Sequence, residues 1–90
     1  MRVAKVIGTI WATRKDPRLS GLTLLLVQPL NVLDGAAYRV PLVCADTIGA
    51  GVGETVLLTT GSGAGGGVLP VDATVVGIVD DSEIDVAAME

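Results

Sequence analysis

Apolar and polar positions along the chain alternate in five short β-rich segments that are separated by turn-forming sequences. β-branched and apolar residues dominate each segment, whereas helical periodicity is weak before residue 82. Five strands are enough for a small barrel, so the pattern predicts an all-β fold, a five-stranded OB-like β-barrel. The predicted strands cover residues 2–12, 22–29, 38–45, 54–60 and 71–79.

Glycine and proline punctuate these segments in ways that predict local irregularities. Gly8 in the first segment indicates a bend or a close backbone approach, and Gly77 interrupts the fifth. Asp34-Gly35 is a strong turn dipeptide, which predicts a hairpin between the second and third strands. Pro41 lacks a backbone N–H, so it places the third strand at an edge or a bulge.

The remaining stretches are typical of loops and tails. Residues 13–21 concentrate charge, proline and glycine, which predicts a solvent-exposed loop. Residues 46–53 predict a second turn, in which Gly49, Gly51 and Gly53 permit positive φ angles. Residues 82–85 fit a capping box, so the chain divides into a barrel domain, 1–81, and a short C-terminal helical turn or tail, 82–90.

Composition points to self-association. Ninety residues supply one core, and 50% of them are apolar. A domain of roughly this size hides only about 60–65% of its unfolded surface, so apolar surface is left over. No stretch approaches the ~20 apolar residues of a membrane-spanning helix, and no secretory signal is evident, so we expect a soluble cytosolic protein. The surplus apolar surface is most simply buried in an interface between identical copies of the chain.

Charge and aromatic content argue against nucleic acid as a partner. Six basic against ten acidic residues give a formal net charge of −4, which opposes attraction to phosphates. Single-strand binding by an OB barrel also uses aromatic platforms, and this chain has only Trp11 and Tyr38. An OB-type nucleic-acid-binding module is therefore only the alternative function. A salt-dependent binding assay with single-stranded oligonucleotides distinguishes it from self-association.

Residues suited to catalysis are sparse. The chain has no histidine, and its single Cys44 lies in an apolar run where thiols pack as small hydrophobes. Gly61, Gly63 and Gly66 give a literal G-x-G-x-x-G, but no helix follows to receive a phosphate. Adjacent acids at 80–81 are typical of solvated charge. We therefore predict no enzyme activity, cofactor or metal, and rank a small enzyme or phosphate-ligand domain last.

One cluster of cations marks a possible partner surface. Arg14, Lys15 and Arg18 lie on the charged loop, where three cations can meet acidic groups across an interface. A solvated loop accounts for them equally well.

An ordered set of motifs identifies a family. The motifs are, in chain order, Val6-x-Gly8, Ala12-Thr13-Arg14-Lys15, Leu19-x-Gly21, Leu24-Leu25-Leu26-Val27-Gln28-Pro29-Leu30, Asp46-x-Ile48-Gly49-Ala50-Gly51-x-Gly53-Glu54-x-Val56, Gly61-Ser62-x-Ala64, Pro70-Val71-Asp72-Ala73 and Gly77-Ile78-Val79-Asp80. With this ordered set the chain resembles the EutN/CcmL family of bacterial microcompartment vertex proteins, and the resemblance runs from residue 1 to residue 80.

The resemblance implies a barrel that assembles into a cyclic pentamer at the five-fold corners of a shell, of carboxysome or metabolosome type, in the bacterial cytoplasm. Its implied partners are four further copies and hexameric shell proteins. Gly65 stands where the family usually has an arginine. The implied residues are Gly61, Ser62, Gly63 and Ala64 near the five-fold axis, Gly49, Ala50, Gly51 and Gly53 at the subunit interface, and Arg14, Lys15 and Arg18 at the rim.

Overall fold

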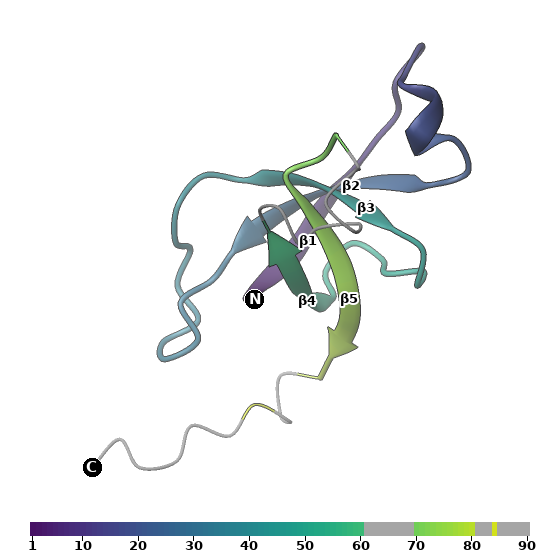
Figure 1. The fold of residues 1–90 in the computed structure, drawn as a ribbon. Helices are drawn as coiled ribbons and strands as arrows, with labels where there is room; N and C mark the ends of the chain where they lie inside the picture. Colours follow the sequence, from purple (N-terminus) through teal and green to yellow (C-terminus); the bar gives the residue numbers. More distant parts are fainter. Residues whose placement is uncertain (61–69, 81–83, 85–90) are drawn as a thin grey trace.

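Five strands close into a barrel in the computed structural model, which describes residues 1–60, 70–80 and 84 (Figure 1). The strand order around the barrel is β1-β2-β3-β5-β4. β3 and β5 pair in parallel, and the other neighbours are antiparallel. The predicted all-β five-stranded barrel is confirmed. The elements are β1 (Arg2–Ile10), a 3-10 turn η1 (Pro17–Leu19), β2 (Thr23–Pro29), β3 (Leu42–Asp46), β4 (Thr55–Thr60) and β5 (Ala73–Val79).

Alternating side chains from all five strands fill the barrel interior. In β1 and β2, Val6 faces Val27 across the ladder, and both are buried. Full burial of one such aliphatic side chain stabilises the fold by about 1.5–3 kcal/mol. The core cluster consists of Ala4, Val6, Leu25, Val27, Cys44, Val56, Leu58, Ala73 and Val75.

The bend predicted at Gly8 is a register shift in the β1–β2 ladder. Val6 pairs with Val27, but Gly8 pairs with Leu26, so one residue of β1 is left over at this point. Such a bulge bends a strand and increases its twist, which helps a small sheet to close. A Cβ atom added to Gly8 would lie 3.8 Å from the Cβ of Leu26, an ordinary contact.

The third predicted strand began too early, at residue 38. The Asp34-Gly35 turn is present, closed by a bridge between Leu30 and Ala37, but β3 begins only at Leu42. Arg39 interrupts the extended run because it has a φ of 69°. The side-chain amide of Gln28 donates to the Arg39 carbonyl at 3.0 Å, and Pro41 then offers no donor to the ladder.

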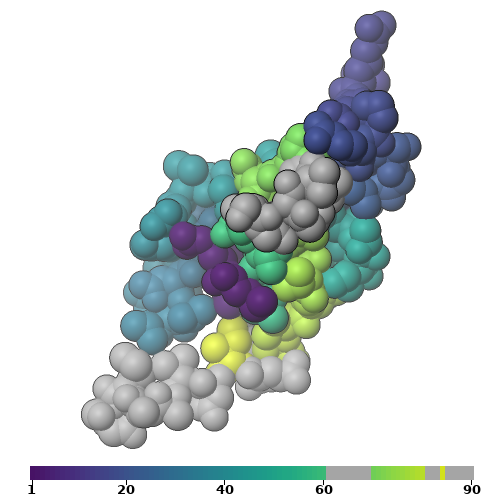
Figure 2. All heavy atoms as spheres, in the orientation of Figure 1, coloured from purple at the N-terminus to yellow at the C-terminus, as the bar shows by residue number. Residues whose placement is uncertain are grey.

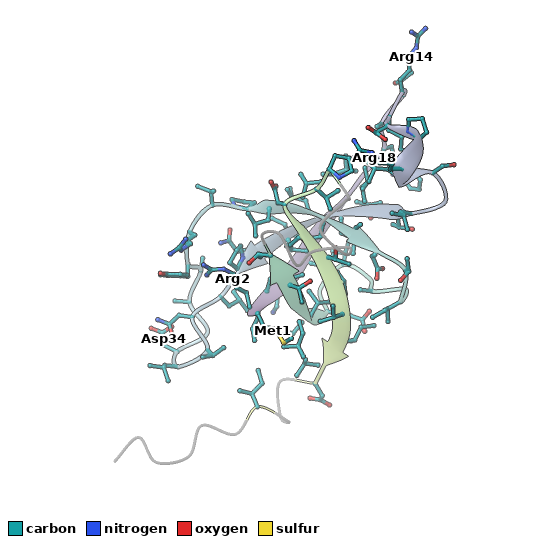
Figure 3. The ribbon with its side chains drawn as sticks, viewed as in Figure 1. Met1, Arg2, Arg14, Arg18 and Asp34 are labelled. Atoms are coloured by element: carbon teal, nitrogen blue, oxygen red, sulfur yellow. The ribbon has the colours of Figure 1, made fainter. Side chains whose placement is uncertain are left out.

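Two features lie at opposite ends of β1. The arm, residues 11–22, projects beyond the barrel and carries Arg14 near its tip (Figure 3). At the other end, the N-terminal residues lie beside the loop that follows β2, where the Leu30 N–H donates to the Val3 carbonyl at 2.9 Å (Figure 2). Within residues 1–60, 70–80 and 84, no helix has the length and apolar character needed to cross a membrane.

Candidate assembly surface

The turn between β3 and β4 is organised by one buried carboxylate. Asp46 is only 3% exposed, and its Oδ1 accepts the Ile48 N–H at 2.9 Å. Its Oδ2 accepts the N–H groups of Gly49 at 3.1 Å and Ala50 at 2.8 Å. A carboxylate that receives several backbone donors satisfies groups that burial would otherwise leave unpaired. The glycines of residues 46–53 predicted a turn here, but no local pattern marked Asp46 as the residue that holds it.

The same turn is tied to the barrel at its second half. The Glu54 Oε1 accepts the Gly51 N–H at 2.6 Å, and the Glu54 N–H donates to the Gly51 carbonyl at 3.1 Å. The Gly53 N–H donates to the Val6 carbonyl at 2.8 Å, and the Val6 N–H donates to the Glu54 carbonyl at 2.9 Å. Residues 46–54 are therefore held by hydrogen bonds within the turn and to β1.

The glycines of this turn divide into two kinds. Gly49 and Gly53 adopt φ angles of 100° and 93°, as predicted, and a Cβ added to either would meet no atom within 4 Å. The prediction of a positive φ was wrong for Gly51. Hydrogen bonds with Glu54 hold the Gly51 backbone, and they do so without a positive φ angle at Gly51. A Cβ added there would lie 3.4 Å from the Glu54 Oε1.

The turn presents apolar side chains to both sides. Ala50 packs inward against the core cluster. Ile48 and Val52 point to solvent and are 47% and 65% exposed. A rigid segment with exposed aliphatic side chains suits contact with another protein surface, because little conformational entropy is lost when it docks.

The arm is ordered by an ion pair. Asp16 Oδ1 accepts the backbone N–H of Arg18 at 2.8 Å and its Nε at 3.0 Å, and Oδ2 accepts the Arg18 Nη2 at 2.8 Å. These donors, the guanidinium first, lower the pKa of Asp16 from 3.8 to about 2. The fork-to-fork contact also positions η1, whose Leu19 is buried.

The three cations predicted as rim contacts differ in their surroundings. Arg18 is engaged by Asp16 within the arm, as described above. The Lys15 Nζ donates to the Leu22 carbonyl at 3.4 Å, and Arg14 extends into solvent at the tip (Figure 3). Trp11, at the base of the arm, is 87% exposed. The arm therefore offers a cation and a large aromatic surface, although its role as a rim contact stays a prediction.

The single thiol and the nearby Asp72 are held in structural roles. Cys44 is fully buried, and burial first, then the charge of Asp72, raises its pKa from 9.0 to about 12. A thiol in this state is a poor nucleophile. Asp72 joins β3 to the start of β5, since its Oδ2 accepts the Val43 N–H at 2.9 Å. In the part of the chain that the structure describes, no three potential metal-ligating side chains gather at one point.

A groove at the N-terminal end of β1 was not predicted. Two adjoining cavities of about 570 and 400 Å³ share the lining residues Val3, Leu30, Asn31 and Val32. We call these two cavities together the N-terminal groove. It is formed by segments far apart in the sequence, so no local pattern could have revealed it.

Tyr38 and Arg2 line one end of this groove, and Arg39 stacks on the Tyr38 ring. The Arg39 guanidinium carbon is 5.2 Å from the centroid of the Tyr38 ring. Hydrogen bonding by Arg39 lowers the pKa of the Tyr38 hydroxyl, and the nearby charge of Arg2 adds to the effect. This edge of the groove is therefore electropositive.

The predicted axis residues Gly61, Ser62, Gly63 and Ala64 lie outside the described residues, as do the rest of the G-x-G-x-x-G segment and residues 82, 83 and 85 of the capping box. Their assignment therefore stays a prediction.

The family model described as ethanolamine utilisation protein EutN/carboxysome matches residues 1–80. The chain belongs to the EutN/CcmL family. This match includes the whole barrel, the arm and the turn that Asp46 organises, and it confirms the resemblance drawn from the ordered motifs.

Members of the EutN/CcmL family are similar to this chain over most of their length. The carboxysome shell vertex protein CcmL of Synechocystis sp. is 46% identical, covering 89% of this chain and 83% of the relative. The microcompartment shell vertex protein PduN of Salmonella typhimurium is 43% identical, covering 89% and 96%. The solved pentameric microcompartment shell protein GrpN of Rhodospirillum rubrum has a TM-score of 0.79 and is 44% identical, covering 89% and 94%. A nucleic-acid-binding role finds no support among these relatives.

Proposed function

We propose that this protein is a structural subunit of a bacterial microcompartment shell, in which five copies form a ring at each vertex. The observation that carries the proposal is the similarity to a solved pentameric shell protein, which has a TM-score of 0.79 and covers 89% of this chain and 94% of that protein. The role is mechanical, because a sheet of hexagonal tiles stays flat and closes only where five-fold units are inserted. It needs no reacting group, which agrees with the buried Cys44.

We assign the subunit contacts to the turn that contains Gly49, Ala50, Gly51 and Gly53. This assignment is supported by the hydrogen-bonded backbone of the turn and by the exposed aliphatic side chains of Ile48 and Val52. Hydrogen bonds inside the turn leave its shape independent of the neighbour, as a repeated ring contact requires. Gly61, Ser62, Gly63 and Ala64 are assigned to the five-fold axis by family resemblance alone.

Contacts with hexameric shell proteins are assigned to the arm. Trp11 and Arg14 are both exposed on the arm, and aromatic residues and arginine are enriched at protein interfaces. Lys15 and Arg18 complete the predicted rim, although Arg18 already pairs with Asp16. We place the assembled protein in the shell of a compartment in the bacterial cytoplasm.

Native mass spectrometry tests the ring directly. We expect a species with five times the mass of the 9.1 kDa chain. A stable single subunit at high concentration would contradict the proposal. Co-production with hexameric shell proteins tests the vertex role: we expect closed particles with the chain and open sheets or tubes without it. Equal closure in its absence would remove the vertex assignment and leave the pentamer intact.

A further inference from the structure

The N-terminal groove combines an apolar floor with a cation in each of its cavities. Val3, Leu30 and Val32 line both cavities. Arg2 lines the first cavity and Lys5 the second, whereas no aspartate or glutamate among the described residues lines either. An occupant of the groove therefore meets apolar and cationic groups.

Part of this apolar lining is open to solvent. Met1 and Tyr38 in the first cavity and Leu33 in the second are exposed, as is Val32, which both cavities share. The N-terminal residues lie on the surface beside the 31–40 segment (Figure 2). Exposed apolar side chains that gather in one hollow with polar groups at its rim are typical of a surface that binds another protein.

The six basic residues of the chain fall into two groups of three. One group is on the arm. The other consists of Arg2 and Lys5 in the groove and Arg39, which stacks on the Tyr38 ring at its edge. The whole chain has a formal net charge of −4, so this positive edge is a local feature of an acidic protein. Such a local field favours an acidic ligand at this one surface.

The two cations in the groove are available to a ligand. Neither Arg2 nor Lys5 forms an ion pair with a carboxylate in the part of the chain that the structure describes. The carboxylates of Asp34 and Glu54, on segments that border the groove, accept backbone N–H groups of their own turns. Arg2 and Lys5 are three residues apart on β1, so their Cα atoms are separated by about 10 Å.

We propose that the N-terminal groove binds a short acidic segment of another protein, in which two carboxylates about 10 Å apart flank apolar side chains. The apolar side chains cover Val3, Leu30 and Val32, and the carboxylates pair with Arg2 and Lys5. Exposed ion pairs contribute little on their own, so the apolar contacts supply most of the affinity and the charges select an acidic partner. The groove lies outside both the turn assigned to the subunit contacts and the arm. This inference therefore does not rest on the pentamer.

Titration of the ¹⁵N-labelled full chain with the peptide acetyl-Ser-Glu-Leu-Leu-Glu-Ser-amide tests the groove. We expect saturable shifts of the amide signals of Val3, Val32 and Tyr38. Replacement of both glutamates of the peptide by lysine should weaken binding roughly ten-fold, and replacement of both leucines by serine should abolish it. Shifts confined to the arm, or equal binding of the glutamate and lysine peptides, would overturn the proposal.

Two double variants with the same loss of charge test the role of the groove cations. Arg2→Gln combined with Lys5→Gln should weaken binding of the glutamate peptide by about three- to ten-fold. Arg14→Gln combined with Lys15→Gln, on the arm, should leave the affinity unchanged. An equal loss in both double variants would show that only long-range charge attracts the peptide, and it would contradict binding in the groove.

Val32→Glu distinguishes an outside partner from a neighbouring copy of the chain. Val32 is exposed, so the variant should fold with an unchanged thermal unfolding midpoint. We expect it to lose peptide binding, because a carboxylate now occupies the floor, and to keep the oligomeric state of the parent chain in native mass spectrometry. Dissociation of the variant with unchanged thermal unfolding would show that a neighbouring copy covers the groove. That result would overturn this inference, while the pentamer of the parent chain would stand.

Discussion

Asp46 and Ala50 are joined by a hydrogen bond of 2.8 Å between the buried carboxylate and the Ala50 N–H. This contact closes the turn after β3 and brings Ala50 against the core cluster. One side chain thereby couples the last residue of a core strand to the segment that we assign to the subunit interface.

Removal of this carboxylate should destabilise the fold. Asp46→Ala leaves the N–H groups of Ile48, Gly49 and Ala50 without their acceptor, so we expect a loss of about 2–4 kcal/mol in the free energy of unfolding. Urea denaturation of the purified chain measures it. Asp34→Ala is the matched control, because Asp34 accepts the Ala36 N–H at 2.9 Å in an exposed turn. The control should lose only about 0.5 kcal/mol, and equal losses would refute the role of Asp46.

Two alanine substitutions should distinguish the glycines of the turn. Gly49→Ala places a Cβ on a residue with a φ of 100°, so we expect a loss of about 1–2 kcal/mol although no atom lies nearby. Gly51→Ala meets only the flexible end of Glu54 and should change stability by less than about 0.5 kcal/mol. Thermal unfolding of both variants checks the difference, and a reversed order would show that the backbone of this turn is not as described.

Local sequence patterns predicted most of the barrel because its strands and bulges are encoded locally. Gly8 marked the register shift, and Asp34-Gly35 marked a real turn. The start of β3 was missed because Arg39 adopts a conformation that is uncommon for a residue with a side chain. That conformation depends on Gln28 of β2, a tertiary contact that spacing along the chain does not reveal.

The assembly surface was predictable only in part. The motif from Asp46 to Glu54 identified the turn through family resemblance, but it could not show that Asp46 is buried or that Gly51 lacks a positive φ. The number of subunits also came from resemblance, since burial and charge favour association without fixing its symmetry. The N-terminal groove depends on segments that only the closed barrel brings together.

Cys44 should respond to pH through its burial. Its pKa rises from 9.0 to about 12 in the folded chain, so the neutral thiol is the form that folding favours. Its contribution to stability is complete below pH 9 and is lost as the pH rises from there toward 12. Unfolding measured across this range should show a smaller decline in Cys44→Ala than in the parent chain. A colorimetric thiol reagent at pH 8 should react with the parent only after denaturation, and rapid reaction of the folded chain would contradict the burial.

Gly51 offers the sharpest test of the subunit interface, because a Cβ atom added there would contact only the end of the Glu54 side chain within its own chain. Gly51→Leu should fold, since the nearest obstacle is the movable carboxylate of Glu54. At a tight contact between copies, however, the added side chain would hold the neighbour away, so we expect native mass spectrometry to show loss of the pentamer. Ala36→Leu places the same side chain on the exposed 31–37 turn and should keep the ring. A pentameric Gly51→Leu variant that still closes shells would remove this turn from the interface while leaving the barrel assignment in place.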